Sequence, residues 1–437
     1  MDRRLLRWHA PLYAAGAIVA AVAALSDRIP LQREWGRIAF IPYTAGAVLA
    51  IVLFGWTGDR LPARRIRHAL AAVVVGVVAG AALLPMALEV WWRARDGFEG
   101  HVQSEVLVTE GSARALLAGS DPYTVSFSGP LSTWPPGTAD HVPYFPAMFA
   151  FGLPRALVGA GPLTDARVAF ALVSMAALAA ALWLARATAT RGLTALVIIL
   201  ALPTGARYMA GGGDDVTVLS VMLLSLVLLR RREPVAAGLV VGLAAAIKLT
   251  AWPLLPFLIL AARDREGRRA SGRTLASASA LMVPFIAPLV LWNPSAFFQD
   301  VVLFPLGLAR EPTLAASPTP GSLLADALSL PKGIVAGILL LIVLLVAGYL
   351  ALVRPPRDAR GAAERTALVM GLAIMLATAG RFGYLLYPIG LLAWARLVLV
   401  GETPQPTPLN PDTRAIRWLH PGGCPSGQRE RSVKSPA

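Results

Sequence analysis

Apolar residues fill most of the chain in long runs, and short clusters of arginine separate one run from the next. A helix of about 20 apolar residues crosses the ~30 Å hydrocarbon core of a bilayer, and many of the runs approach this length. The pattern therefore predicts an all-α, polytopic membrane protein. The apolar segments lie at 11–26, 38–56, 69–92, 144–158, 166–185, 192–209, 214–229, 235–262, 274–292, 332–353, 366–380 and 383–400.

The arginine clusters indicate which loops face the cytoplasm, because positively charged loops tend to stay on that side. The strongest clusters lie at 60–67, 230–232, 263–273 and 354–365. They predict that both termini are cytoplasmic and that the loops 93–143 and 293–331 are extracytoplasmic. Three arginines between the first two apolar segments then lie outside, against the trend.

The segment 144–158 is too short for an ordinary crossing. A helix of about fifteen residues reaches only about 22 Å, and this one carries Pro146 and Pro154. A re-entrant or interfacial helix here keeps the later arginine clusters in the cytoplasm. With that choice, the chain has about twelve transmembrane helices.

The segment 235–262 lies between two basic clusters, so it crosses the membrane twice or not at all. Two helices of about fourteen residues would span about 21 Å each and would meet near Lys248. A lysine inside a membrane segment is costly and by default marks a functional site. Short, interrupted helices are also where membrane proteins place polar sites.

The composition also indicates a membrane protein, and it argues against a nucleic-acid-binding protein. The 437 residues are 56% hydrophobic, with a mean hydropathy of +0.62. The net charge of +15 does not indicate a nucleic-acid partner, because the arginines lie in loops between apolar runs. We expect residues 1–400 to form one transmembrane domain that begins with an uncleaved first span. The Pro- and Arg-rich stretch 401–437 is expected to be a disordered cytoplasmic tail.

Sulfur and histidine are too sparse to suggest a metal centre. The single cysteine, Cys424, rules out an intrachain disulfide and a multi-thiolate site, and the five histidines show no metal-ligand spacing. Asp140-His141 is expected to be part of a solvated loop. We therefore predict no metal and no cofactor.

The acidic and aromatic loop 93–143 is the candidate catalytic region. A helix from about Ser104 to Ala118 would place Glu105 on one face with Thr109 and Ser112, at spacings of four and seven. Asp121 precedes a proline, which favours a turn. A long loop with this composition is typically functional.

Two motifs resemble a known family. Glu105 is followed by VLVTEGSARALLAGSDPY and later by Tyr144-Phe145-Pro146, and the stretch Arg231 to Leu260 contains Ala-Ile-Lys-Leu-Thr. Together they resemble the polyprenol-phosphate-mannose-dependent alpha-1,2-mannosyltransferases of the C-type (GT-C) glycosyltransferase superfamily. The matching stretches frame residues 93–262.

The chain departs from that family's pattern at four places. Glu105 stands where the family usually has Asp, and Gly212-Gly213-Asp214-Asp215 stands where it has Gly-Gln-x-Asn. Tyr-Phe-Pro replaces Tyr-Pro-Pro, and Ala-Trp-Pro follows Lys-Leu-Thr. These changes bear on the acceptor and on the sugar more than on the reaction type.

The resemblance implies a GT-C-like fold and an inverting transfer of a hexose, expected to be mannose. The donor would be a polyprenyl-phosphate-linked sugar, and the acceptor a cell-envelope glycan or glycolipid on the extracytoplasmic side of the plasma membrane. Glu105 would be the base, with Lys248 and Arg381 on the donor phosphate. Further substrate-binding candidates are Asp121, Tyr123, Tyr144, Arg207, Asp214 and Asp215.

Other interpretations remain open from the sequence. Arg310 is a weaker phosphate candidate, and Arg381 could instead anchor the chain at the headgroups. Tyr384 and Tyr387 are expected to belong to an aromatic belt. A lipid-linked sugar transporter or flippase is the main alternative function, although it would more naturally show two related halves.

Overall fold

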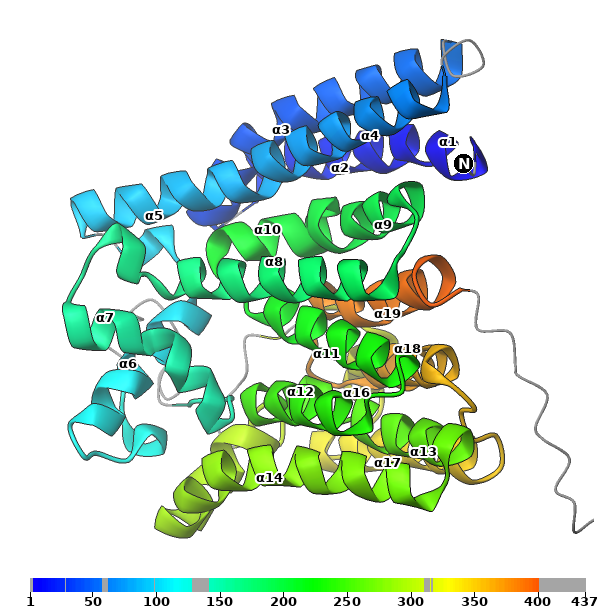
Figure 1. Ribbon diagram of the computed structural model, residues 1–437. Helices are drawn as coiled ribbons and strands as arrows, with labels where there is room; N and C mark the ends of the chain where they lie inside the picture. Colours follow the sequence, from blue (N-terminus) through cyan, green and yellow to red (C-terminus); the bar gives the residue numbers. More distant parts are fainter. Residues whose placement is uncertain are drawn as a thin grey trace, which may run out of the picture. The chain divides into compact units, whose positions relative to one another are not determined.

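The structure is a computed structural model that describes residues 3–27, 29–56, 62–97, 99–127, 141–309, 315 and 317–400 (Figure 1). Within these residues, all regular secondary structure is helical. The longer helices are α2 (His9–Ser26), α3 (Pro30–Ala50), α4 (Ala63–Val78), α5 (Leu84–Asp96), α6 (Ser104–Leu117), α8 (Ala166–Ala185), α11 (Asp215–Arg230), α12 (Pro234–Ile247), α13 (Leu254–Glu266), α14 (Arg268–Trp292), α17 (Lys332–Leu352), α18 (Ala359–Leu376) and α19 (Leu386–Leu397).

Six helices of the described residues are long and apolar enough to cross a membrane. A seventh span is formed if α9 (Ala189–Leu196) and α10 (Pro203–Gly211) are taken together, with a bend of 54° between them. Proline at the first position of α10 explains the break, because it cannot continue the preceding helix. The protein is therefore a multi-pass membrane protein, as predicted, but helix length supports fewer spans than the predicted twelve.

The arginine clusters gather at one end of the helix bundle. Arg230 donates to the carbonyl of Val398 at 2.7 Å, and Arg231 donates to the carbonyl of Leu184 at 3.3 Å. The carboxyl-terminal ends of α8, α11 and α19 therefore lie together. We call this end of the bundle the basic end.

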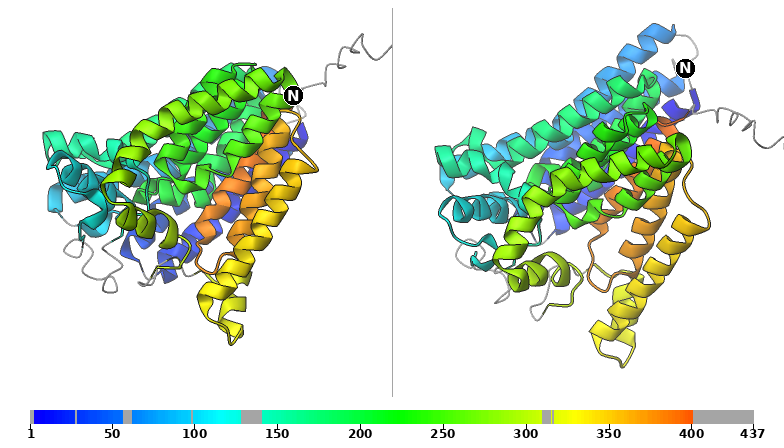
Figure 2. Two further views of the ribbon diagram at one scale, coloured as in Figure 1. Left: turned by 90° about the horizontal axis from the view of Figure 1, so that it is seen from below. Right: turned by 60° about the horizontal axis from the view of Figure 1, so that its bottom comes forward.

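The two predicted outer loops meet at the opposite end of the bundle. Asn293, just after α14, donates its side-chain amide to Asp121 at 3.0 Å. The turn at Lys248 and the start of α19 reach the same end, which is also where α6 lies (Figure 2).

The segment 144–158 forms a seven-residue 3₁₀ helix, η6 (Pro146–Gly152), and a six-residue helix, α7 (Leu153–Val158). At about 2.0 and 1.5 Å per residue, the two are shorter than the ~30 Å hydrocarbon core. A Cβ on Gly152 would lie 2.4 Å from the carbonyl oxygen of Thr109, so η6 packs directly on α6. The segment therefore supports α6 and is too short to be a span.

The helix break expected near Lys248 is present. Helix α12 ends at Ile247, Lys248 is extended (φ −152°, ψ 143°), and α13 begins at Leu254. Helix α12 packs closely on α14, because Cβ atoms on Gly238 and Gly242 would lie 2.4 and 2.6 Å from backbone carbonyl oxygens of α14. Small residues four apart allow such contact between membrane helices.

Candidate active site

A carboxylate and a guanidinium group from distant parts of the chain meet at the end opposite the basic end. Nη1 of Arg381 donates to Oε1 of Glu105 at 2.8 Å, and Oγ of Ser104 donates to Oε2 at 3.1 Å. The Glu105 side chain is 11% exposed and that of Arg381 is 31% exposed. The pair is therefore largely shielded from solvent but still partly accessible to it.

The amino-terminal turn of α6 holds Glu105 in place. The amide of Gln103 donates to the carbonyl of Gly211 at 2.8 Å, which fixes this turn to the end of α10. One turn later, the hydroxyl of Thr109 donates to the carbonyl of Glu105 at 2.7 Å. Glu105, Thr109 and Ser112 lie within this helix, as predicted, and all three are buried.

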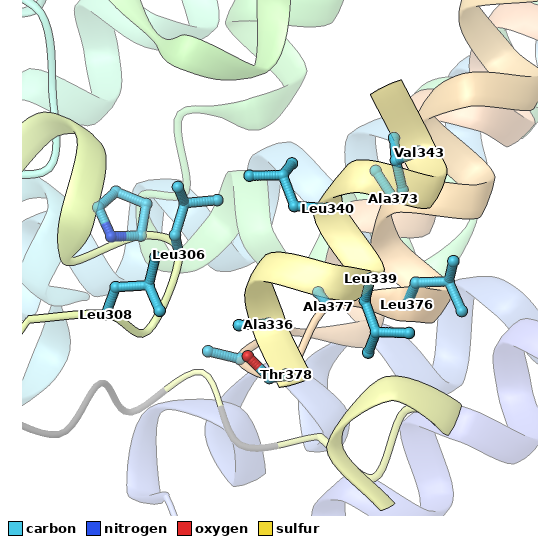
Figure 3. A pocket seen from close by; sticks show the side chains of 12 residues that line it. Leu306, Leu308, Ala336, Leu339, Leu340, Val343, Ala373, Leu376, Ala377 and Thr378 are labelled. Carbon is cyan, nitrogen blue, oxygen red and sulfur yellow. The ribbon is translucent and has the colours of Figure 1, made fainter. Parts of the chain in front are cut away.

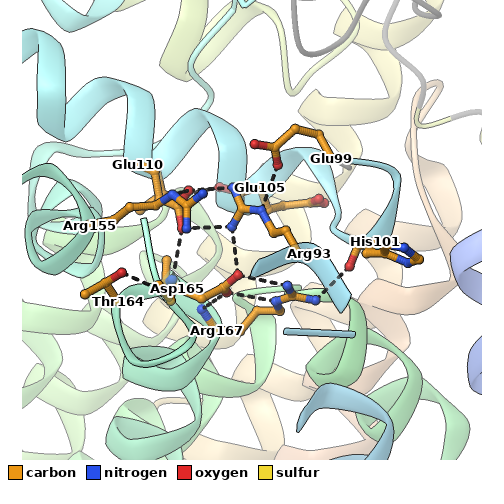
Figure 4. A network of polar contacts seen from close by, with 12 residues as sticks. Arg93, Glu99, His101, Glu105, Glu110, Arg155, Thr164, Asp165 and Arg167 are labelled. Carbon is orange, nitrogen blue, oxygen red and sulfur yellow. Dashed lines mark hydrogen bonds and ion pairs between the residues drawn. The ribbon is translucent and has the colours of Figure 1, made fainter. Parts of the chain in front are cut away.

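A buried network of arginines and carboxylates holds the other side of α6 (Figure 4). Arg93 donates to both carboxylate oxygens of Glu110, at 3.1 and 2.7 Å, and to Asp165 at 2.7 Å. Arg155 lies 3.2 Å from Glu110. Because Glu110 also accepts the amide of Ala166 at 3.1 Å, its carboxylate is saturated and its role is structural.

Asp165 stays ionised within this network. Burial alone would raise its pKa, but the hydrogen bonds and charges of Arg167 and Arg93 outweigh burial and lower the pKa to about 2. Asp165 also caps α8, where its side chain accepts the amide of Arg167. The network thus joins the end of α5, α6 and the start of α8.

The second polar cluster surrounds Lys248. Its ammonium lies 2.6 Å from Oδ1 of Asp214 and 2.6 Å from Oδ1 of Asp215. The aromatic rings of Tyr144 and Tyr384 have their centroids 5.5 and 5.6 Å from the same nitrogen, a distance at which a cation and a ring attract each other. Lys248 therefore has the partners that a buried cation requires.

Tyr384 lies between the two clusters. Its ring centroid lies 5.6 Å from the Lys248 ammonium, and its backbone amide donates to the carbonyl of Arg381 at 3.0 Å. The two clusters therefore form one site. With ionised side chains, Glu105, Asp214, Asp215, Lys248 and Arg381 carry three negative charges and two positive ones.

The expectation that Tyr384 and Tyr387 form an aromatic belt is wrong. Tyr387 is fully buried, donates to Asp215 at 2.8 Å and accepts from the hydroxyl of Thr250 at 2.7 Å. The available signal was the spacing of three between Tyr384 and Tyr387, which places both on one face at the start of a helix.

Several buried side-chain oxygens accept no hydrogen bond from the described residues, and two of them lie on residues next to these clusters. They are Oδ2 of Asp214 and Oε1 of Gln103. Buried acceptors are rarely left unpaired, and such atoms call for an explanation. Gln103 was not singled out from the sequence.

The other predicted site residues have structural partners. Asp121 accepts the amide of Tyr123 at 3.0 Å and the side chain of Asn293, as expected of a turn residue. The hydroxyl of Tyr123 donates to the carbonyl of Tyr144 at 2.8 Å. These contacts brace the outer loops against each other.

Arg207 points away from the two clusters. It pairs with Asp27 at 2.8 Å, donates to Gln32, and lies 6.0 Å from the ring centroid of its neighbour Tyr208. Tyr208 was not predicted. It lies against Gly383, where a Cβ would come within 2.6 Å of its ring. Arg310 and Asp140 lie outside the described residues.

An apolar cavity of about 90 Å³ lies at the carboxyl-terminal end of α18 (Figure 3). One wall is the segment 305–308, the second is α17 with Leu339 and Leu340, and the third is 376–379 at the end of α18. The third wall ends two residues before Arg381. Among the described residues, no group of three or more His, Cys, Asp or Glu side chains is placed to hold a metal ion.

A helical membrane bundle that gathers ionisable and aromatic side chains at one end has the layout of a membrane-embedded enzyme. Residues 143–379 match the model of glycosyltransferase family 87, a GT-C-type family. This region is more than half of the chain, so the protein belongs to that family and is a glycosyltransferase. The family favours an enzyme over the flippase that the sequence left open.

The family match covers Lys248, Asp214 and Asp215 and ends just before Arg381. Glu105 precedes the matched region. Comparison with curated proteins and with solved structures gave no match.

Proposed function

We propose that this enzyme transfers a hexose, which we take to be mannose, from a polyprenyl-phosphate donor to a cell-envelope glycan or glycolipid. The transfer inverts the anomeric centre and takes place on the extracytoplasmic side. The observation that carries the proposal is the contact between Glu105 and Arg381. This contact supports the proposal, because a carboxylate can accept a proton and a guanidinium group can bind a phosphate.

The chemistry is a single displacement at the anomeric carbon. The acceptor hydroxyl attacks this carbon as its bond to the phosphate oxygen breaks, and the phosphate leaves with the bonding electrons. Glu105 takes the hydroxyl proton as general base, and Arg381 stabilises the charge on the departing phosphate. One base is enough for inversion, in contrast to the two carboxylates of most glycoside hydrolases.

The Glu105–Arg381 pair links these two events. Once Glu105 accepts the proton, it no longer balances the charge of Arg381. The phosphate gains negative charge at the same moment and takes the place of the carboxylate as its partner. The arginine thus interacts most strongly when the leaving group departs, which is what lowers a barrier.

Lys248 is the second cation on the donor side in this proposal. Because two carboxylates already hold it at 2.6 Å each, it contributes less net positive charge to a phosphate than Arg381 does. We assign the free oxygen of Asp214 to a sugar hydroxyl and the rings of Tyr144 and Tyr384 to the apolar faces of the sugar. Asp215 orients Lys248 and Tyr387.

The apolar cavity at the carboxyl-terminal end of α18 is assigned to the first part of the polyprenyl chain. Its walls include Leu306 and Leu340, and Leu341, Leu344 and Leu345 on α17 are exposed on the same helix. A lipid chain could thus pass from the bilayer to the cavity, with its phosphate at Arg381.

We propose that the basic end of the bundle is cytoplasmic and that the site is extracytoplasmic. About twelve crossings result if α11, α12, α13, α18 and α19 also span between the two ends. These helices are shorter, and α11 and α12 lie largely within the bundle. A lipid-linked donor suits an external site, because nucleotide sugars are held in the cytoplasm.

The proposal is tested with membranes containing wild-type enzyme or the Glu105→Gln variant, radiolabelled polyprenyl-phosphate mannose and a host lipid extract. We expect label in a new glycolipid or glycan with the wild type and a loss of about 10²-fold or more in the variant. Equal transfer by both would assign the base to another residue. No transfer by a correctly inserted wild type would contradict the donor, and other lipid-linked sugars would be tried next.

A further inference from the structure

Asp300 is a buried carboxylate in the second outer loop that binds two consecutive residues of the first. It lies on η10 (Gln299–Leu303) and is 3% exposed. Nδ1 of His141 lies 2.6 Å from its Oδ1, and the amide of Val142 donates to its Oδ2 at 2.7 Å. The ring of His141 also stacks on Phe304, with 4.3 Å between centroids.

The segment that begins at His141 leads directly into the site. The carbonyl of Tyr144 accepts the hydroxyl of Tyr123, and the amide of Phe145 donates to the carbonyl of Ile247 at 3.1 Å. Ile247 is the residue before Lys248. These contacts leave the ring of Tyr144 5.5 Å from the Lys248 ammonium.

We infer that Asp300 is a positioning residue for the transfer reaction, which it serves by fixing the His141–Phe145 segment so that Tyr144 faces Lys248. It acts through Tyr144 and not on the substrate. A misplacement of about 1 Å in a site can cost about 10²-fold in rate. The inference rests on the proposed function only in so far as Tyr144 and Lys248 line the active site.

The same turn also supports the Arg381 side of the site. After η10 the chain forms one wall of the apolar cavity. Gly307 in this wall has φ +69°, and a Cβ there would lie 2.7 Å from the Cβ of Ala379, two residues before Arg381. A shift of η10 would therefore reach both polar clusters.

Hydrogen exchange tests the inference without any substrate. In the full-length protein in detergent, Asp300→Ala should increase deuterium uptake in peptides that cover 141–147. Asp300→Asn, whose amide oxygen can still accept the Val142 amide, should stay close to the wild type. Unchanged uptake in Asp300→Ala would overturn the inference, and so would equal uptake increases in both variants.

Kinetics then separate positioning from general stability. We expect Asp300→Ala to lower kcat by about 10–100-fold and Asp300→Asn to recover most of the loss. The effects of Asp300→Ala and Tyr144→Leu should not add, since one residue acts through the other. Additive effects would overturn the inference.

A second variant keeps the test decisive if Asp300→Ala does not accumulate in the membrane. His141→Phe retains a ring to stack on Phe304 and loses the nitrogen that contacts Asp300. It should increase uptake at 141–147 to a smaller extent, and wild-type uptake would overturn the inference. Failure of the donor assignment would appear as an inactive wild type and would leave the exchange result unaffected.

Discussion

Lys248 and Asp214, which are far apart in the sequence, form a buried ion pair with 2.6 Å between Nζ and Oδ1. The turn between α12 and α13 is thereby fixed to the start of α11. Asp215 forms a second pair with the same ammonium at 2.6 Å. The lysine that marks the broken helix is therefore part of the fold as well as of the proposed chemistry.

Lys248→Met should strongly destabilise the protein. It leaves two buried carboxylates without a cation, and breaking a buried ion pair from one side costs about 3–5 kcal/mol. Thermal unfolding in detergent would show a clear decrease in Tm. The triple variant Lys248→Met, Asp214→Asn and Asp215→Asn should recover part of the loss. No decrease in the single variant would contradict the buried pair.

Arg381→Ala should reduce transfer by about 10²–10³-fold, as expected when a group that stabilises the transition state is removed. Because the side chain of Arg381 is 31% exposed, the unfolding temperature should decrease less than in Lys248→Met. Arg381→Lys should restore part of the rate, since it returns the charge but not the planar fork of donors. A wild-type rate in Arg381→Ala would assign the phosphate elsewhere.

Gly242→Val should separate α12 from α14. The added Cβ would lie 2.6 Å from a backbone oxygen of Ala278, and overpacking of this kind costs about 1–3 kcal/mol. The matched control is Gly337→Val on α17, where a Cβ meets nothing within 4 Å in the described residues. Equal unfolding temperatures for the two variants would contradict the close helix packing.

We expect the protein to lose stability in acid because of Asp165. Its pKa in the folded protein is about 2, below the ordinary value of ~3.9, so the folded state favours the ionised form. The resulting stabilisation, roughly 2 kcal/mol, is present above about pH 4 and is lost as the pH falls toward 2. Unfolding measured from pH 6 to pH 3 should show this decrease.

Asp165→Asn is the control for the acid effect. Its stability should be lower at pH 6 and should change less between pH 6 and pH 3 than that of the wild type. Identical pH dependence in both proteins would show that other carboxylates cause the decrease.

The sequence was sufficient for the membrane class, for α6 and for the break at Lys248. Each follows from a local count: the length of an apolar run, the spacing from Glu105, or the 28 residues between two basic clusters. The expected helix from Ser104 to Ala118 is observed as Ser104–Leu117. Such features need no knowledge of which helices are neighbours.

The partners of the polar residues could not be predicted in the same way. Asp300 contacts His141, and Arg207 contacts Asp27, across more than 150 residues of sequence. These pairs depend on which helices pack against each other. Hydrophobic runs of similar composition do not specify that arrangement. Tyr387 was misassigned for this reason, because its burial comes from α11 and the Lys248 turn.

The arginine clusters and the candidate active site lie at opposite ends of the bundle, so substitutions can change one without changing the other. Substitutions among the arginines could reverse the orientation of the chain without altering any contact of Glu105, Lys248 or Arg381. In the proposed orientation, such a protein would fold with an intact candidate site that faces the compartment opposite its substrates. Such a variant would be inactive in the cell because of its orientation in the membrane. Purified in detergent, it would still catalyse transfer.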